Sequence, residues 1–196
     1  MSHHIYQTEG VVLGGFNVGE SNRFLYIFTR DLGLVGASAQ GVRELKSKLR
    51  YSLQDFSYSS VDLVRGKEVW RVVNAGQVRD ARVLIKNIEK RKVFVGVTSL
   101  LKRLCAGEGA HEGMFEEVLS GLLFLEKEEF TKEELRFFEI ILILKTLNYL
   151  GYWGENEKFT NFIDTKQWNK KLLHKMHPLF KEALREVNSA IKESHL

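Results

Sequence analysis

The sequence has few of the residues that staple small folds and none of the long apolar runs that cross membranes. Its one cysteine, Cys105, excludes an intrachain disulfide and a zinc site made of four sulfurs. No run approaches the roughly 18 uninterrupted apolar residues that a membrane span needs, and residues 1–9 lack the apolar core of a signal peptide. We therefore expect a soluble protein with no membrane partner, suited to a reducing cytoplasm.

Composition limits the size of the fold and the charge of its partners. With 196 residues, 44% of them hydrophobic, the chain can form one large domain or two small ones. The formal net charge of +4 favours an anionic partner without requiring one. Residues 65–103 hold 11 Lys or Arg against 3 acids, and residues 108–139 reverse that balance. Solvated helix faces would explain either run alone, whereas a neighbouring basic loop favours a surface for a polyanion.

The apolar pattern changes near residue 80. Before it, turn residues separate short runs rich in β-branched and aromatic residues, which predicts five strands with no helix between them. Five such strands favour a small closed barrel. We therefore expect an α+β chain of two domains, a barrel over residues 1–79 and a helical domain over residues 80–196. The strands are expected at residues 5–16, 23–29, 34–39, 56–64 and 68–75.

After residue 80, apolar residues recur at helical spacing. The clearest signal is a capping box formed by Thr131 and Glu134, ahead of a helix that Gly151 ends. Pro178, the only proline, is expected in the first turn of the last helix, where its missing N–H is harmless. The predicted helices cover residues 88–104, 112–125, 131–150, 166–175 and 178–194.

A basic loop, residues 41–50, joins the third and fourth predicted strands. If the loop is extended, alternation at 46, 48 and 50 would point three cations to one side, at a spacing that could follow successive phosphates. Aromatic residues nearby fill the barrel core where they face inward; those facing outward would offer stacking surfaces to bases. The four loop cations are Arg43, Lys46, Lys48 and Arg50.

No group of residues in the sequence predicts catalysis or a bound metal. A hydrolase needs a nucleophile, a base and an orienting group together, and the candidates here are scattered. Cys105 lies near the end of an apolar helix, which indicates an inert buried thiol. His174 and His177 could share a helix face, but no third ligand stands at a recognisable spacing. We therefore expect a protein that is not an enzyme and needs no cofactor or metal.

Several short motifs occur in order along most of the chain. They are ESNR at 20–23, FTRDLGL at 28–34, AQGVR at 39–43, KSKLR at 46–50, LQDF at 53–56, MFEEVL at 114–119, LRFFE at 135–139 and LNYLGY at 147–152. In these motifs the chain resembles the RecO family of DNA repair and recombination mediators, over residues 5 to about 153.

The resemblance implies an N-terminal OB-fold followed by a helical domain, with no enzymatic activity. It implies binding to single- and double-stranded DNA and annealing of complementary strands. With RecR, such a protein helps to load RecA onto strands coated by single-stranded-DNA-binding protein. It would be cytoplasmic and associated with the nucleoid. The alternative left open by the residues is a non-catalytic OB-fold adaptor that binds mainly an acidic protein.

The resemblance also suggests residues for two binding surfaces. One is a basic rim that holds the acidic C-terminal tail of single-stranded-DNA-binding protein, for which Arg136 is the candidate. A cation near the start of a helix opposes the macrodipole, so a local ion pair with a neighbouring acid is the alternative reason for Arg136. The other surface binds DNA, and its expected residues are Arg23, Arg43, Lys46, Lys48 and Arg50.

The chain departs from the family pattern at three places. Asn22 stands where the family usually has Asp, and Gln40 stands where a Lys is usual, which removes one cation from the expected DNA surface. Many members carry a cysteine cluster after the LNYLGY motif, but residues 153–164 contain no cysteine. We therefore expect zinc to be absent and the chain to be a shortened form.

Overall fold

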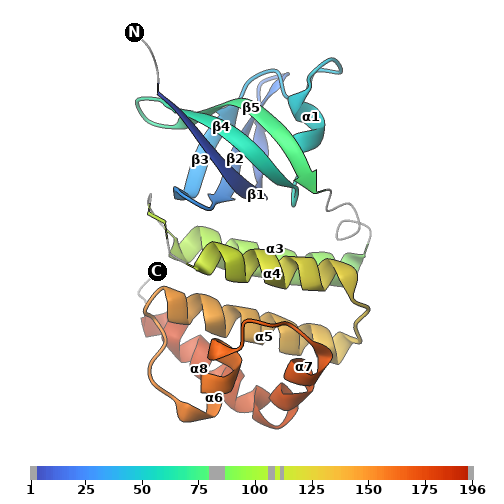
Figure 1. Cartoon of the computed structure of the whole chain (residues 1–196), viewed down its shortest axis with the longest axis vertical. Helices are drawn as coiled ribbons and strands as arrows, with labels where there is room; N and C mark the ends of the chain where they lie inside the picture. Colours follow the sequence, from blue (N-terminus) through green and yellow to red (C-terminus); the bar gives the residue numbers. More distant parts are fainter. Residues whose placement is uncertain (1–3, 80–86, 106–108, 111–112, 194–196) are drawn as a thin grey trace. The chain divides into compact units, whose positions relative to one another are not determined.

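The structure is a computed structural model that describes residues 4–79, 87–105, 109–110 and 113–193. The chain divides into two compact units, one of residues 1–86 with 105–110 and one of residues 87–104 with 111–196. The first unit holds the strands and the second holds the long helices (Figure 1). The predicted boundary between residues 79 and 80 stays a prediction, because residues 80–86 lie outside the described part of the chain.

Five strands close into a barrel in the order β1-β2-β3-β5-β4. β1 pairs antiparallel with β2 on one side and with β4 on the other, while β3 and β5 run parallel. This small closed barrel is the OB-fold, so the predicted fold class is confirmed. The strands are β1 (Ile5–Val18), β2 (Asn22–Thr29), β3 (Gly33–Ala39), β4 (Tyr58–Arg65) and β5 (Trp70–Arg79).

Alternation along the strands separates the barrel core from its outer face. In β3, Val35, Ala37 and Ala39 are buried while the residues between them are partly exposed, as period two requires. β1 is long and bends around the barrel, with a register shift between Val12 and Gly15. A Cβ atom on Gly15 would overlap the carbonyl oxygen of Phe24, so β1 can approach β2 this closely only with glycine there.

The segment between β3 and β4 is folded rather than extended. Glu44 N–H donates to the carbonyl of Gly41, and Ser47 N–H donates to the carbonyl of Glu44, both at 3.1 Å. These successive turns lead into a short helix, α1 (Leu49–Ser52), which the sequence analysis did not predict. The extended conformation considered for positions 46, 48 and 50 is therefore wrong, because local backbone hydrogen bonds curl the loop instead.

The helical unit is built around α5 (Lys132–Tyr149), which contacts each of the other α-helices of the unit. The capping box is confirmed, since Thr131 Oγ1 accepts from Glu134 N–H and Thr131 N–H donates to Glu134 Oε2. Gly151, with φ of 74°, ends the helix as expected. The others are α3 (Ile88–Leu104), α4 (Met114–Lys127), α6 (Glu157–Asp164), α7 (Lys170–Met176), η1 (His177–Leu179) and α8 (Phe180–Glu193).

Two asparagine caps explain where the helix predictions are wrong. α6 was not predicted, and it begins where the side chain of Asn156 accepts from Lys158 N–H. α7 begins at Lys170 rather than at residue 166, because the side chain of Asn169 caps it. The expected start of α4 at residue 112 lies outside the described residues. None of the helices in the described ranges combines the length and the apolar composition of a membrane span.

Candidate nucleic-acid interface

Arg23, in β2, holds the far end of the basic loop. Its Nη2 donates to Asp55 Oδ1 at 2.7 Å, and its Nη1 donates to the carbonyl of Leu53 at 3.3 Å. The side chain is only 18% exposed. Charge-assisted hydrogen bonds of this kind are stronger than neutral ones, so Arg23 fastens the loop to the barrel.

The near end of the loop is tied to the hairpin between β1 and β2. Arg43 N–H donates to the carbonyl of Ser21 at 2.9 Å, and Arg43 Nη1 donates to the carbonyl of Gly19 at 3.0 Å. Gly41 N–H donates to Asn22 Oδ1 at 2.9 Å. Asn22, which departs from the family pattern, therefore offers through its amide oxygen the acceptor that a carboxylate would also provide.

The segment that follows the basic loop and α1 is held against β1. Phe56 has φ of 73°, the one positive φ among the described residues other than glycine. That conformation costs about 1–2 kcal/mol. Backbone hydrogen bonds on both sides offset the cost: Phe56 N–H donates to the carbonyl of Val12 at 2.8 Å, and Val12 N–H donates to the carbonyl of Ser57 at 2.9 Å.

Between these anchors, the tip of the loop presents cations to solvent. Lys46, Lys48 and Arg50 are exposed, and no ion pair or side-chain hydrogen bond of theirs is found among the residues that the structure describes. Beside them lies an open pocket of about 340 Å³. Its lining residues are Arg23, Val42, Arg43, Arg50, Leu53 and Gln54.

The structure thus brings three of the five expected DNA-binding residues to one pocket. Arg23, Arg43 and Arg50 surround it, and Lys46 and Lys48 lie on the turns between the last two. Guanidinium groups bind phosphate oxygens through two parallel hydrogen bonds, which suits them to a sugar-phosphate backbone. Sequence reasoning did not single out Asn22 and Asp55 as positioning residues, although both lie in the motifs that carry the family resemblance.

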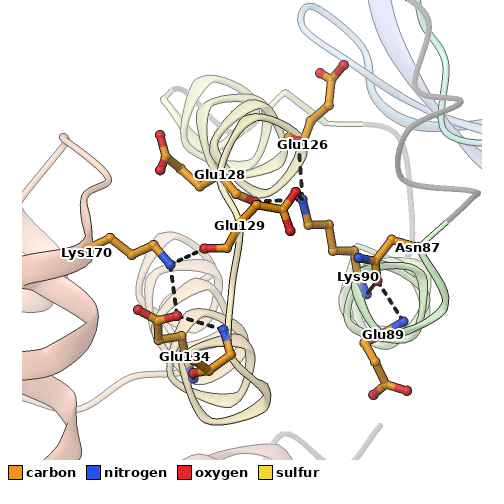
Figure 2. Close-up of polar contacts among 9 residues, drawn as sticks. Asn87, Glu89, Lys90, Glu126, Glu128, Glu129, Glu134 and Lys170 are labelled. Carbon is orange, nitrogen blue, oxygen red and sulfur yellow. Dashed lines mark hydrogen bonds and ion pairs between the residues drawn. The ribbon is translucent and has the colours of Figure 1, made fainter.

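The basic run that begins at residue 65 has another use in the helical unit. Lys90, in α3, is 2% exposed, and its Nζ donates to the carbonyls of Glu126, in the last turn of α4, and of Glu128, just after it. Lys170 approaches the same segment from another side, donating to the carbonyl of Glu129 and to Glu134 Oε2 (Figure 2). Lys90 satisfies carbonyls left free at the end of α4, and Lys170 holds the segment that follows this helix. They therefore belong to the framework of the unit rather than to a surface for a polyanion.

Arg136, the candidate for the tail-binding rim, is exposed on α5. The neighbouring acids have other partners, since Glu134 contacts Lys170 and His174 while Glu133 lies 3.5 Å from His177. Within the described ranges Arg136 forms no ion pair, so the local pair considered as an alternative is not the reason for its position. Its role in binding an acidic tail stays a prediction.

The described residues offer little for chemistry. Cys105 is buried, as expected, and burial raises the pKa of its thiol to about 11, which disfavours the reactive thiolate. His174 lies 3.1 Å from a Glu134 oxygen and is used in that contact. Over the described parts of the chain, no three His, Cys, Asp or Glu side chains gather where they could hold a metal.

The sequence of the chain is similar to those of known proteins. The family model "Recombination protein O N terminal" matches residues 1–82. A DNA repair protein RecO of Dehalococcoides mccartyi is 31% identical over 160 residues, which are 81% of this chain and 61% of that protein. The RecO protein of Alkaliphilus metalliredigens is 32% identical over 75% of this chain and 58% of its own length.

The similarity includes both units but not the whole of the relatives. It reaches from the barrel into the helices, and the chain spans about three fifths of the length of the curated relatives that it matches. The family match falls on the unit that carries the anchored basic loop. Over residues 1–82 the chain carries the N-terminal domain of the RecO family, and over most of its own length it is similar to RecO proteins.

Proposed function

We propose that this chain binds DNA through the basic loop of its OB-fold and acts in DNA repair and recombination by annealing complementary strands. One observation carries the proposal. Arg43 and Arg50 of the loop and Arg23 of β2 line one open pocket, and the tip cations of this anchored loop have no partner among the described residues. The tip cations can therefore meet phosphates without breaking an internal ion pair, whereas Arg23 is already paired with Asp55.

The annealing step follows from the charge of the partners. Two DNA strands repel each other through their phosphates, and bound cations lower that repulsion while releasing condensed counterions. Arg43, Lys46, Lys48 and Arg50 would neutralise phosphates of the two strands at the loop tip, with Arg23 contributing from the pocket. The mechanism is electrostatic and needs no covalent step, so we propose a mediator rather than an enzyme.

The partners proposed for the chain rest on its family. The matched relatives are named DNA repair proteins. We propose that the chain works with RecR in helping to load RecA onto strands coated by single-stranded-DNA-binding protein. Binding to both single- and double-stranded DNA belongs to the same proposal, because the loop contacts described here would read phosphates rather than bases.

Salt dependence tests the DNA contact. Four or five phosphate contacts predict that the logarithm of the affinity falls with the logarithm of salt concentration with a slope of about −3 to −5. Replacing Arg43, Lys46, Lys48 and Arg50 together by Ala should flatten the slope to about −1 and abolish annealing. The matched control replaces four exposed lysines of the helical unit, Lys127, Lys171, Lys181 and Lys192, by Ala.

The outcome distinguishes two functions. A parent that binds no DNA at low salt, or whose binding does not respond to salt, would reject the mediator in favour of the adaptor that binds an acidic protein. Equal losses in the loop variant and in the control variant would also contradict the loop as the DNA-binding site, because both carry the same change in net charge.

Arg136 is tested separately on the helical unit. Arg136→Glu should weaken binding of an acidic peptide with the sequence of the tail by about tenfold, or about 1.4 kcal/mol. Arg185→Glu, on the exposed face of α8, makes the same change in charge and should leave the affinity unchanged. Unchanged affinity in Arg136→Glu would remove Arg136 from the proposal without affecting the DNA contact.

A further inference from the structure

The outer face of the barrel carries a row of residues that the basic loop does not use. Phe16 in β1 pairs in register with Phe24 in β2, Phe24 pairs with Ser38 in β3, and Ser38 pairs with Arg71 in β5. These four residues, the outer row, occupy adjacent strands at one level of the sheet. Since neighbouring strands lie about 4.8 Å apart, the outer row spans about 14 Å.

The aromatic end of the outer row is exposed and ordered by its own contacts. The rings of Phe16 and Phe24 stack with centroids 5.1 Å apart and an interplanar angle of 21°. Tyr26 meets Phe24 edge to face at 5.5 Å. Phe16 is nevertheless 53% exposed, so a large part of its surface is free to meet another planar group. A cluster of aromatic rings at a surface, unlike a single exposed side chain, indicates a binding site.

A glycine makes room for this arrangement. A Cβ atom on Gly36 would lie 2.7 Å from Cζ of Phe24, so the Phe24 ring lies directly over the backbone of β3. The tip of the Phe24 ring therefore lies close to the backbone of β3, while the ring itself stacks with Phe16. This support fixes the orientation of the exposed ring before any ligand arrives, which reduces the ordering cost of binding.

The other end of the outer row is cationic. Arg71 is exposed, and the described residues include no partner for its guanidinium group. The row also begins close to the basic loop, because Phe16 and Phe24 lie just before and just after the hairpin whose carbonyls of Gly19 and Ser21 hold Arg43. Aromatic rings beside cations that match phosphates are the two components of a surface for unpaired nucleotides.

We propose that the outer row binds an unpaired strand of nucleic acid, with a base stacked on Phe16 and a phosphate held by Arg71. The inference rests on the DNA-binding function proposed above and assigns its single-strand component to a separate set of residues. A duplex keeps its bases stacked on one another, so it offers only phosphates to this face. The outer row therefore distinguishes an unpaired strand from a duplex, which the loop cations do not.

Binding to a thymidine oligonucleotide and to a blunt duplex of the same length tests the proposal on the full chain. Phe16→Ala should weaken binding of the single strand by about 5- to 150-fold, the range for one stacked base, and leave the duplex affinity unchanged. Tyr152→Ala, which removes an exposed aromatic ring from the helical unit, is the matched control and should change neither. Phe16→Trp should retain binding, with its indole fluorescence quenched by the single strand.

Arg71→Ala gives an independent readout. It should lower the salt slope for the single strand by about 0.7, the contribution of one phosphate.

Two results for Phe16→Ala would overturn the outer row while leaving the loop proposal intact, provided that the parent binds both the single strand and the duplex. One is an equal loss of affinity for the two ligands, and the other is no loss of affinity for either. A parent that binds neither would overturn both. If Phe16→Ala instead converts a sedimenting dimer to a monomer, the outer row is a contact with a second copy and the proposal is wrong.

Discussion

The two units of this chain use positive charge in opposite ways. At the tip of the barrel loop, Lys46, Lys48 and Arg50 are exposed and have no partner among the described residues. In the helical unit, Lys90 and Lys145 are almost fully buried and bound to carbonyls and carboxylates. The difference teaches that a basic run in a sequence does not identify a binding surface. What identifies it is a cation whose hydrogen-bonding capacity the fold leaves unused.

The ion pair of Lys145 and Glu117 in the helical unit is the clearest example of a cation that the fold buries. Nζ of Lys145, in α5, lies 2.9 Å from Oε1 of Glu117, in α4, and donates to the carbonyl of Thr165. The two side chains are 0% and 6% exposed. Glu117 Oε1 accepts no hydrogen bond with good geometry within the described ranges, so the ion pair alone compensates its burial.

Breaking that pair should give the largest effect. Lys145→Met leaves a buried carboxylate without its cation, and we expect a loss of about 3–5 kcal/mol in the free energy of unfolding of the helical unit. Urea titration followed by tryptophan fluorescence measures it. Adding Glu117→Leu should recover most of the loss, while Lys127→Met, at an exposed site, should change little. If Lys145→Met alone were as stable as the parent, the comparison between the two units would be wrong.

Arg23 tests the comparison within the barrel, because it lies beside the basic loop and its guanidinium group is bound to Asp55 and to the carbonyl of Leu53. Arg23→Ala should lower the stability of the barrel by about 1–3 kcal/mol, since it leaves the Leu53 carbonyl and Asp55 without their donor. A double-mutant cycle with Asp55→Ala measures the coupling. If Arg23→Ala keeps full stability and loses only DNA affinity, Arg23 belongs with the tip cations instead.

Low pH tests how much Glu134, which binds Lys170, contributes to the stability of the helical unit. Hydrogen bonds from Lys170 and from the backbone of Thr131 lower its pKa from 4.5 to about 2. Because the pKa in the folded protein is depressed, this stabilisation is complete above pH 4.5 and is lost as the pH falls toward 2. Between those values the parent should lose about 1–2 kcal/mol more than Glu134→Gln, measured by thermal unfolding. Parallel stability curves for the two proteins would contradict this role.

The smallest effect on stability is expected at the loop tip. Lys48→Ala should change the free energy of unfolding by less than about 0.5 kcal/mol, since the side chain is exposed and unpaired in the described structure. The same variant should reduce the salt slope of DNA binding by about 0.7–0.9. A stability loss comparable to that of Arg23→Ala would mean that the tip is part of the framework as well.

Much of the fold follows from patterns that a single sequence displays. Runs of β-branched and aromatic residues between turn residues identified all five strands, and the capping box of Thr131 and Glu134 placed the start of α5. The short helices were harder, because α1 and α6 span 4 and 8 residues, too few turns to show a clear period. Their starts depend on local hydrogen bonds such as the Asn156 cap, which compete with many similar possibilities.

The basic loop was predicted in position but not in conformation. The charge of residues 41–50 marked the loop, yet its folded shape depends on acceptors elsewhere, such as Asn22 Oδ1 and the carbonyl of Ser21. The burial of Lys90 could not be predicted from the sequence either, because its acceptors are backbone carbonyls, which every residue has. The outer row emerges only once the strand register places Phe16 beside Phe24 and Ser38 beside Arg71.

Because the basic loop is anchored at both ends, the residues between the anchors contribute little to the stability of the barrel. Because the hairpin carbonyls fasten one end and Arg23 with β1 fastens the other, residues 44–50 are largely released from the task of holding the barrel together. We therefore expect substitutions, insertions and deletions in this interval to change the proposed DNA affinity while the barrel keeps its fold. We therefore expect a library of variants at residues 44–50 to contain proteins with a range of DNA affinities on the same barrel.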